Sequence, residues 1–159
     1  MRIFITAILS IYMVTLAGCN PPLPGSTIFP SPIIKPTPTQ GFAIYLLDPD
    51  IPPQKLAIQS HLELTKTPLI SGSDIVFYQK TTHEIELTSA GYEKIHNLTV
   101  GVYGKSFAVC VDGQPIYAGG FWADYSSLSF DGIVIDVTSV TSEHPVIQIQ
   151  LGYPGPDAD

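Results

Sequence analysis

A turn between two apolar runs is the sequence feature that most constrains the fold. Residues 107–111 (FAVCV) are apolar at consecutive positions, as in a strand that is buried on both faces. A second strand-forming run, residues 115–119 (PIYAG), follows soon after Asp112 and Gly113. Asp-Gly favours a tight hairpin turn, so residues 107–111 are predicted to pair with residues 115–119. We interpret Cys110 as a small buried apolar side chain and Asp112 as a turn residue, rather than as a reactive pair.

Other segments predict several strands and one helix. Alternating apolar and polar residues predict half-buried strands at 83–87 and 146–151, and further strands are expected at 42–47 and 130–137. The inward positions of the two alternating strands are Ile85, Leu87, Ile147, Ile149 and Leu151. A helix is expected at 89–98, with Thr88 as its N-cap. We therefore expect an α+β fold, in which one main helix packs on a small mixed or antiparallel sheet.

The predicted helix has an apolar face made of Gly91, Ile95 and Leu98. A glycine on a buried helix face lowers helix propensity by about 1 kcal/mol. Two explanations stay open at this point. Either the helix approaches the sheet closely at Gly91, or the glycine is tolerated because it lies near the first turn.

The N-terminus resembles the export signal of a bacterial lipoprotein. Arg2 precedes a mostly apolar run, residues 3–16, that is too short for a permanent membrane span. Residues 16–19 (LAGC) resemble the lipobox, in which the cysteine is acylated and becomes the new N-terminus. The resemblance implies a signal peptide at residues 1–18 and lipidation of Cys19. The mature protein is then expected on the extracytoplasmic side of the cell membrane or outer membrane, and Cys110 has no cysteine left for an intrachain disulfide.

Proline content and charge define the rest of the chain. Residues 20–40 contain seven prolines and favour polyproline II, so residues 19–40 are expected to form a lipid-anchored tether. Residues 41–153 are expected to form a single domain, and residues 154–159 a flexible tail. The formal net charge is −7 and Arg2 is the only arginine. This charge argues against a nucleic-acid partner and against broad contact with anionic lipid headgroups.

Four short motifs together resemble the extracytoplasmic head domain of SecD, a subunit of the SecDF accessory complex of bacterial protein export. They are residues 69–75 (LISGSDI), 86–91 (ELTSAG), 104–109 (GKSFAV) and 111–116 (VDGQPI). The resemblance implies an α+β module without catalytic residues that engages an unfolded polypeptide. The positions that carry over are structural: Gly72, Asp74, Gly91, Gly104, Lys105, Asp112 and Gly113.

The chain also departs from the SecD pattern. Residues 118–122 (AGGFW) replace the segment that follows the hairpin in SecD, and no counterpart of SecD's transmembrane helices is expected. SecD uses those helices to exploit the proton gradient. The resemblance therefore implies only the passive part of the family's role, which is contact with a polypeptide or with another envelope component.

Aromatic residues gather beside the predicted hairpin, interleaved with glycine and serine. Residues 120–129 are expected to connect the hairpin to the strand at 130–137, and connections of this length are usually exposed and often functional. Large aromatic side chains suit binding interfaces. We therefore expect a partner-binding site that contains Tyr117, Phe121, Trp122 and Tyr125, with packing in the core as the alternative.

The sequence contains no signature of catalysis, and no metal or cofactor is expected. The four histidines, His61, His83, His96 and His144, include no pair with metal-ligand spacing, and no nucleophile elbow or phosphate loop is present. We expect a non-enzymatic lipoprotein that binds or scaffolds a polypeptide or an envelope partner, with a link to protein export implied by the resemblance. Two alternatives stay open. One is an envelope hydrolase that uses His83 or another histidine with a carboxylate, and the other is a spacer without a ligand.

Overall fold

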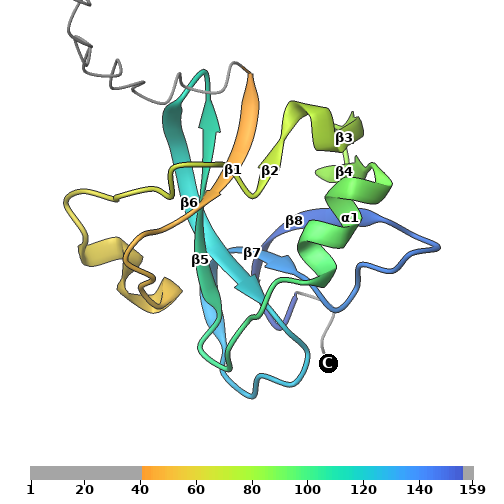
Figure 1. Ribbon diagram of the computed structural model, residues 1–159. Coiled ribbons are helices and arrows are strands. Elements are labelled where there is room, and N and C mark those ends of the chain that lie inside the picture. Colours follow the sequence, from red (N-terminus) through yellow and green to blue (C-terminus); the bar gives the residue numbers. More distant parts are fainter. Residues whose placement is uncertain (1–40, 156–159) are drawn as a thin grey trace, which may run out of the picture. The chain divides into compact units, whose positions relative to one another are not determined.

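The structure, a computed structural model, describes residues 41–155 (Figure 1). These residues contain one sheet of eight strands, in the order β2-β1-β5-β6-β7-β8-β4-β3. The strands are β1 (Phe42–Leu46), β2 (Ile70–Ser71), β3 (Ile75–Gln79), β4 (Glu84–Leu87), β5 (Lys105–Val111), β6 (Gln114–Trp122), β7 (Phe130–Asp136) and β8 (Val146–Tyr153). The helices are the α-helix α1 (Ser89–His96) and two 3-10 helices, η1 (Pro53–Ile58) and η2 (Gly72–Asp74). The predicted signal peptide, Cys19, the tether and the last four residues of the predicted tail lie outside the described residues.

The expected α+β class is wrong, because the domain is mainly β. The sheet curls into a half-barrel, with β1, β5 and β6 in the left half of Figure 1 and β3, β4 and α1 together at the right. Helix α1 has only eight residues and buries only Gly91 and Ile95. Such a short helix cannot form a layer of its own, so the sheet supplies most of the core, to which α1 adds Ile95. Strands β2 and β3, which the sequence analysis did not anticipate, stand at the two ends of the sheet.

The predicted hairpin is confirmed. Strands β5 and β6 are antiparallel, with Val111 opposite Gln114 and Phe107 opposite Gly119. Asp112 and Gly113 both have positive φ angles, of 50° and 75°, as the tight turn requires. The side chain of Asp112 also accepts a hydrogen bond of 2.7 Å from the backbone N–H of Gly41, which ties the turn to the start of β1.

The two faces of β5 contribute to different clusters. Phe107 and Val109 join the main core, together with Ile44, Ile85, Phe121, Ile135 and Ile147. On the opposite face of β5, Cys110 packs with Ala43 and Tyr45. The prediction that Cys110 is a buried apolar residue is confirmed, since the side chain is fully buried. Burial raises the pKa of the Cys110 thiol, so the thiol stays protonated at neutral pH.

The other local predictions are largely confirmed, with corrections at the ends of elements. Ile85 and Leu87 are buried in β4, and Thr88 caps α1 by accepting a hydrogen bond of 3.1 Å from Gly91 N–H. The helix ends at His96, two residues earlier than expected. In β8, Ile147 is buried but Leu151 is 72% exposed, so the predicted inward position of Leu151 is wrong. Strand β8 also continues to Tyr153, close to the start of the predicted tail.

The connection predicted at 120–129 is shorter, because β6 continues through Trp122. Residues 120–122 pair in parallel with β7, with Trp122 opposite Asp136. Phe121 points into the main core, and Trp122 points to the opposite face of the sheet. The indole is fully buried and stacks on Phe130, with ring centroids 5.5 Å apart. The expectation that Phe121 and Trp122 lie on a binding surface is therefore wrong.

Glycine at position 104 makes room for this indole. A Cβ atom at position 104 would lie 2.6 Å from the Trp122 ring, and Gly104 has a positive φ angle of 74°. Both the close contact and the backbone angle therefore require glycine here. The indole Nε1 has no hydrogen-bond partner among the described residues, so Trp122 is held by packing rather than by a polar contact.

Trp122→Ala is expected to lower the free energy of unfolding by about 3 to 5 kcal/mol, because it leaves a large cavity between Gly104 and Phe130. Trp122→Phe is the matched control. It keeps an aromatic ring and removes a hydrogen-bond donor that has no partner. Its loss in free energy of unfolding is therefore expected to be less than half that of Trp122→Ala. Chemical denaturation measures both values. Equal stability of Trp122→Ala and the original chain would contradict the packing described here.

Candidate functional site

The four aromatic residues predicted to bind a partner do not form one surface. Phe121 and Trp122 are buried, whereas Tyr117 is half-buried and Tyr125 is 60% exposed. The hydroxyl of Tyr125 donates a hydrogen bond to the carbonyl of Val100, so its exposed ring is fixed to the loop that follows α1. Tyr117 and Tyr125 line different pockets. Of the four residues, only Tyr117 belongs to the site described next.

An apolar recess of about 420 Å³ lies between the two halves of the curled sheet. One side is formed by β1, β5 and β6, through Phe42, Val109, Val111, Ile116 and Tyr117. The other side is formed by η2, β3, β4 and β8, through Gly72, Ile75, Tyr78, Ile85 and Ile149. We call this space the seam recess. It contains no acidic or basic side chain, so it suits an apolar group.

The seam recess exists because the sheet does not close into a full barrel. The sheet ends in β2 on one side and in β3 on the other. Strand β2 has only two residues, and no strand pairing between β2 and β3 is present in the described part of the chain. Apolar side chains that a closed barrel would cover are therefore accessible between the two ends.

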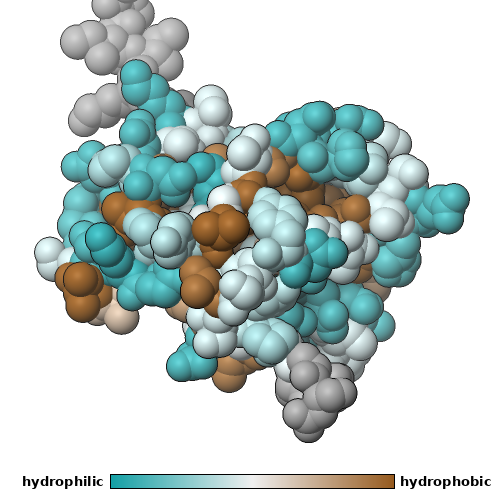
Figure 2. Space-filling model, turned by 90° about the horizontal axis from the view of Figure 1, so that it is seen from below, coloured by the Kyte–Doolittle hydropathy of each residue, from teal (hydrophilic) through white to brown (hydrophobic). Residues whose placement is uncertain are grey.

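Several apolar side chains at the seam recess are exposed to solvent. The exposed fractions are 48% for Tyr78, 42% for Val111 and 60% for Ile116. Val76 and Phe77, which are next to Tyr78 on β3, are 60% and 55% exposed. The face of the domain in Figure 2 is mostly teal and white, with several hydrophobic areas, the largest of them near the centre. Clustered apolar exposure of this kind typically marks an interaction site.

The hydroxyl group of Tyr117 does not add charge to this site at neutral pH. Burial, and secondly the neighbouring Tyr78, raise the pKa of Tyr117 above its ordinary value of 10.0. The Tyr78 hydroxyl lies 3.3 Å from Nδ1 of His83, outside the lining of the recess. The seam recess can therefore hold an apolar group by burial, with no charged side chain aimed at it.

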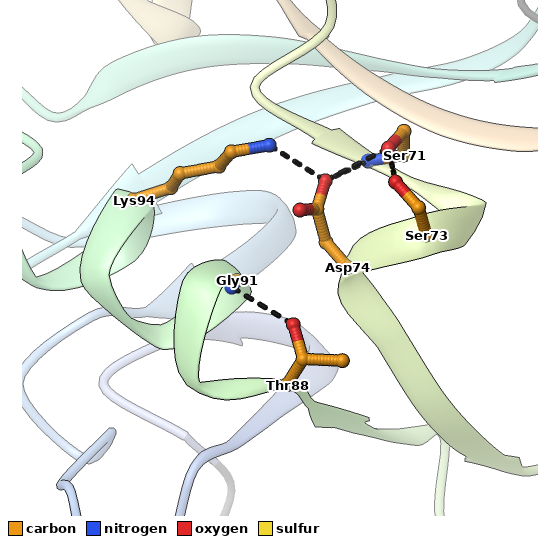
Figure 3. A network of polar contacts seen from close by, with 6 residues as sticks. All are labelled: Ser71, Ser73, Asp74, Thr88, Gly91 and Lys94. Atoms are coloured by element: carbon orange, nitrogen blue, oxygen red, sulfur yellow. Dashed lines mark hydrogen bonds and ion pairs between the residues drawn. The ribbon is translucent and has the colours of Figure 1, made fainter.

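The short link that borders the seam recess is fixed by the carboxylate of Asp74 (Figure 3). Asp74 is only 4% exposed. Its Oδ2 accepts hydrogen bonds of 2.8 Å from both the backbone N–H and the hydroxyl of Ser71, and it pairs with Nζ of Lys94 at 2.7 Å. These contacts connect the end of β2, helix η2 and helix α1.

The backbone of Asp74 makes a second connection to α1. Its carbonyl accepts a hydrogen bond of 2.9 Å from the N–H of Thr88. A Cβ atom at position 91 would lie 2.6 Å from the same carbonyl oxygen. Gly91 therefore allows a close approach, which answers the question left open by the sequence. The helix approaches η2 here and not the face of the sheet, as Figure 3 also shows.

The pKa of Asp74 is lower than its ordinary value of 3.8. Burial alone would raise this pKa, but the hydrogen bonds from Lys94 and Ser71 stabilise the charged form and outweigh it. A carboxyl group with a lowered pKa in the folded state adds stability above its ordinary pKa. That stability is lost as the pH falls through the folded-state value.

The remaining positions carried over from the SecD resemblance also have structural roles. Nζ of Lys105 pairs with Asp50 at 2.5 Å, which ties the start of β5 to the segment before η1. Asp112 and Gly113 form the hairpin turn, and Gly104 accommodates Trp122. Gly72 lines the seam recess, where a Cβ atom would meet nothing within 4 Å.

The histidines are dispersed over the domain, and all four are exposed. His83 and His96 each contact a tyrosine hydroxyl, those of Tyr78 and Tyr92. His61 lines a separate pocket of about 250 Å³ that Glu63 also lines, without a hydrogen bond between the two side chains. No group of three or more potential metal ligands occurs within residues 41–155.

Sequence reasoning missed strand β3, which contributes Ile75 and Tyr78 to the lining of the recess. Residues 75–79 (IVFYQ) are rich in β-branched and aromatic residues, which is the usual signal for a strand. That signal could have identified β3. Its position at the end of the sheet depends on pairings between distant segments, which no local pattern contains.

Asp74→Asn is expected to lower the free energy of unfolding by about 1 to 3 kcal/mol at pH 7, because it removes a buried carboxylate charge and weakens its contacts with Ser71 and with the partly exposed Lys94. The difference from the original chain should stay nearly constant from pH 7 to about pH 5 and shrink as the pH falls below the ordinary pKa of 3.8, since the original chain then loses the same contribution. Denaturation at several pH values measures this. Asp131→Asn, at an exposed carboxylate, should change stability by less than about 0.5 kcal/mol. A difference that stays constant with pH would contradict the assigned role of Asp74.

Within residues 41–155, no helix is long and apolar enough to cross a membrane. Comparisons of the chain with models of protein families, with curated proteins and with solved structures gave no match. The functional part of the SecD resemblance therefore stays a prediction.

Proposed function

We propose that the protein is a non-enzymatic lipoprotein of the cell envelope, which is held at the membrane by a lipid on Cys19 and binds a polypeptide partner at the seam recess. The observation that carries this proposal is the apolar recess of about 420 Å³ with exposed Tyr78, Val111 and Ile116 at it. A recess of this size can bury one or a few apolar groups of a ligand. In an unfolded polypeptide such groups are accessible.

The charge of the chain narrows the choice of partner. A net charge of −7 repels nucleic acids and anionic lipid surfaces, and it favours partners that are neutral or positively charged. The resemblance of roughly residues 68–135 to the SecD head favours the same class of ligand, an unfolded chain during export. These two arguments are independent, because one uses composition and the other uses the motifs.

The two alternative functions have less support. A hydrolase needs a histidine and a carboxylate within hydrogen-bonding reach in a concave site. The hydrogen bonds recorded for histidine rings in the described domain go instead to tyrosine hydroxyls. A spacer without a ligand has no need for clustered exposed apolar residues, whereas Val76, Phe77 and Tyr78 are exposed next to the recess.

Ile116→Asp tests the proposal, because it places a charge at the apolar recess. The matched control is Ile58→Asp, at a residue that is 78% exposed and lies outside the recess. The probe is fluorescently labelled lysozyme that has been reduced and alkylated with iodoacetamide, which is unfolded and positively charged. Ile116→Asp should weaken binding of this probe by about 1 to 3 kcal/mol, as the loss of an interface anchor does, and Ile58→Asp should leave it unchanged. Equal affinity of both variants and the original chain, measured by fluorescence anisotropy, would refute the proposal.

Cys19→Ser tests the anchoring. Without the cysteine thiol there is no site for acylation, so the variant should move from the membrane fraction to the soluble fraction when cells are lysed without detergent. The original chain should stay with the membrane, since each buried methylene contributes about 0.8 kcal/mol to attachment. A Cys19→Ser chain that still sediments with membranes would show that another feature holds the protein there. Fractionation followed by immunoblotting distinguishes the two results.

A further inference from the structure

Strand β3 has one edge without a strand partner. In the described sheet it pairs only with β4 and stands at the end of the strand order. We propose that β3 is a strand-addition site. An extended, non-acidic segment of an unfolded polypeptide pairs with this edge and places apolar side chains of every second residue in the seam recess. This inference rests on the proposed function and specifies how the partner is held.

The hydrogen bonds of β4 indicate which backbone groups of β3 are free. Leu87 N–H donates to Pro145, and the His83 carbonyl accepts from Ile149, so these two residues of the β4 segment point their backbone groups toward the β8 side. Backbone groups of successive residues alternate in direction, so Glu84 and Glu86 point toward β3.

The register then fixes the direction of the groups on β3. Phe77 lies opposite Glu86, and Gln79 lies opposite Glu84, so both form hydrogen-bonded pairs with β4. Tyr78 lies between them, opposite Ile85, and its N–H and C=O point toward the open edge. Those two groups are the natural partners for an added strand.

The side chains of β3 favour the same mode of binding. The ring of Tyr78 lines the seam recess, so one residue provides both a backbone contact and an apolar contact. None of residues 75–79 is charged or proline. Edge strands are usually protected by charges, by proline or by short length. The other end of the sheet is protected in this way, because β2 has only two residues.

Charge favours a foreign polypeptide over a second copy of this chain. A second copy would bring another net charge of −7 to the interface. Glu86 is exposed on β4, directly beside β3, and Glu84 is partly exposed. A segment with lysine at its ends, and with alternating apolar residues between them, complements both the acidic surroundings and the apolar recess.

A nine-residue peptide, Lys-Val-Thr-Val-Thr-Val-Thr-Val-Lys, tests the inference on the full chain in phosphatidylcholine nanodiscs. Two isomers with three N-methyl groups each are compared, one methylated at the first three valines and one at the three threonines. N–H groups of alternate residues point to opposite edges of a strand, so only one isomer should lose the hydrogen bonds to β3. We expect that isomer to bind at least tenfold more weakly than the other. If the valine-methylated isomer binds more weakly, the peptide pairs antiparallel to β3. If the threonine-methylated isomer binds more weakly, the peptide pairs parallel to β3.

Two protein variants complete the test. Phe77→Lys, which charges the edge, should weaken the unmethylated peptide at least tenfold, and Val102→Lys, at an exposed residue outside the recess, should not. Equal binding of the two isomers would overturn strand addition. If alkylated lysozyme still bound in that case, the proposed function would stand. Failure of both probes to bind would overturn both proposals. A concentration-dependent dimer in analytical ultracentrifugation that Phe77→Lys abolishes would assign the edge to a second copy, and it would also overturn the inference.

Discussion

The hydrogen bonds and the ion pair of the Asp74 carboxylate are the interaction on which the rest of this domain depends. Strands β2 and β3 stand at opposite ends of the sheet, yet only the three residues of η2 separate them in the sequence. A link of this length forces the two ends of the sheet to lie near each other. The contacts of Asp74 with Ser71 and Lys94 hold the link in one conformation, so they also fix the curl of the sheet.

The same link explains why the domain has an accessible apolar site. Three residues can bring the two ends of a sheet together, but they cannot supply the ladder of hydrogen bonds that would close a barrel. The ends therefore stay unpaired, and the side chains between them form the seam recess. Stability and proposed binding are thus connected. A change that loosens η2 should alter the recess even when no residue lining the recess is changed.

Local signals in the sequence were sufficient for elements that depend on neighbouring residues. The turn at Asp112-Gly113, the cap at Thr88 and the alternation in β4 were all predicted correctly. The fold class was wrong because it depends on how strands from distant segments pair. The parallel pairing of residues 120–122 with β7 extends β6 into a segment that was expected to be an exposed loop. The binding site at Phe121 and Trp122 was wrong for the same reason, since that pairing buries both side chains.

Glycines leave room for the buried Trp122 ring, whereas no glycine makes such room for the exposed aromatic residues of β3. Trp122 fits against the sheet because position 104 has no side chain, and Gly120 lets Pro53 of η1 cover the same face. The aromatic residues of β3 lack such an arrangement. Gly72 and Tyr78 both line the recess, and no atom lies within 4 Å of the position that a Cβ atom of Gly72 would take, so the space there is not filled by a packed ring. The unfilled space in the recess that Tyr78 also lines supports the proposal that a partner binds at β3, whereas the packed ring of Trp122 leaves no such space.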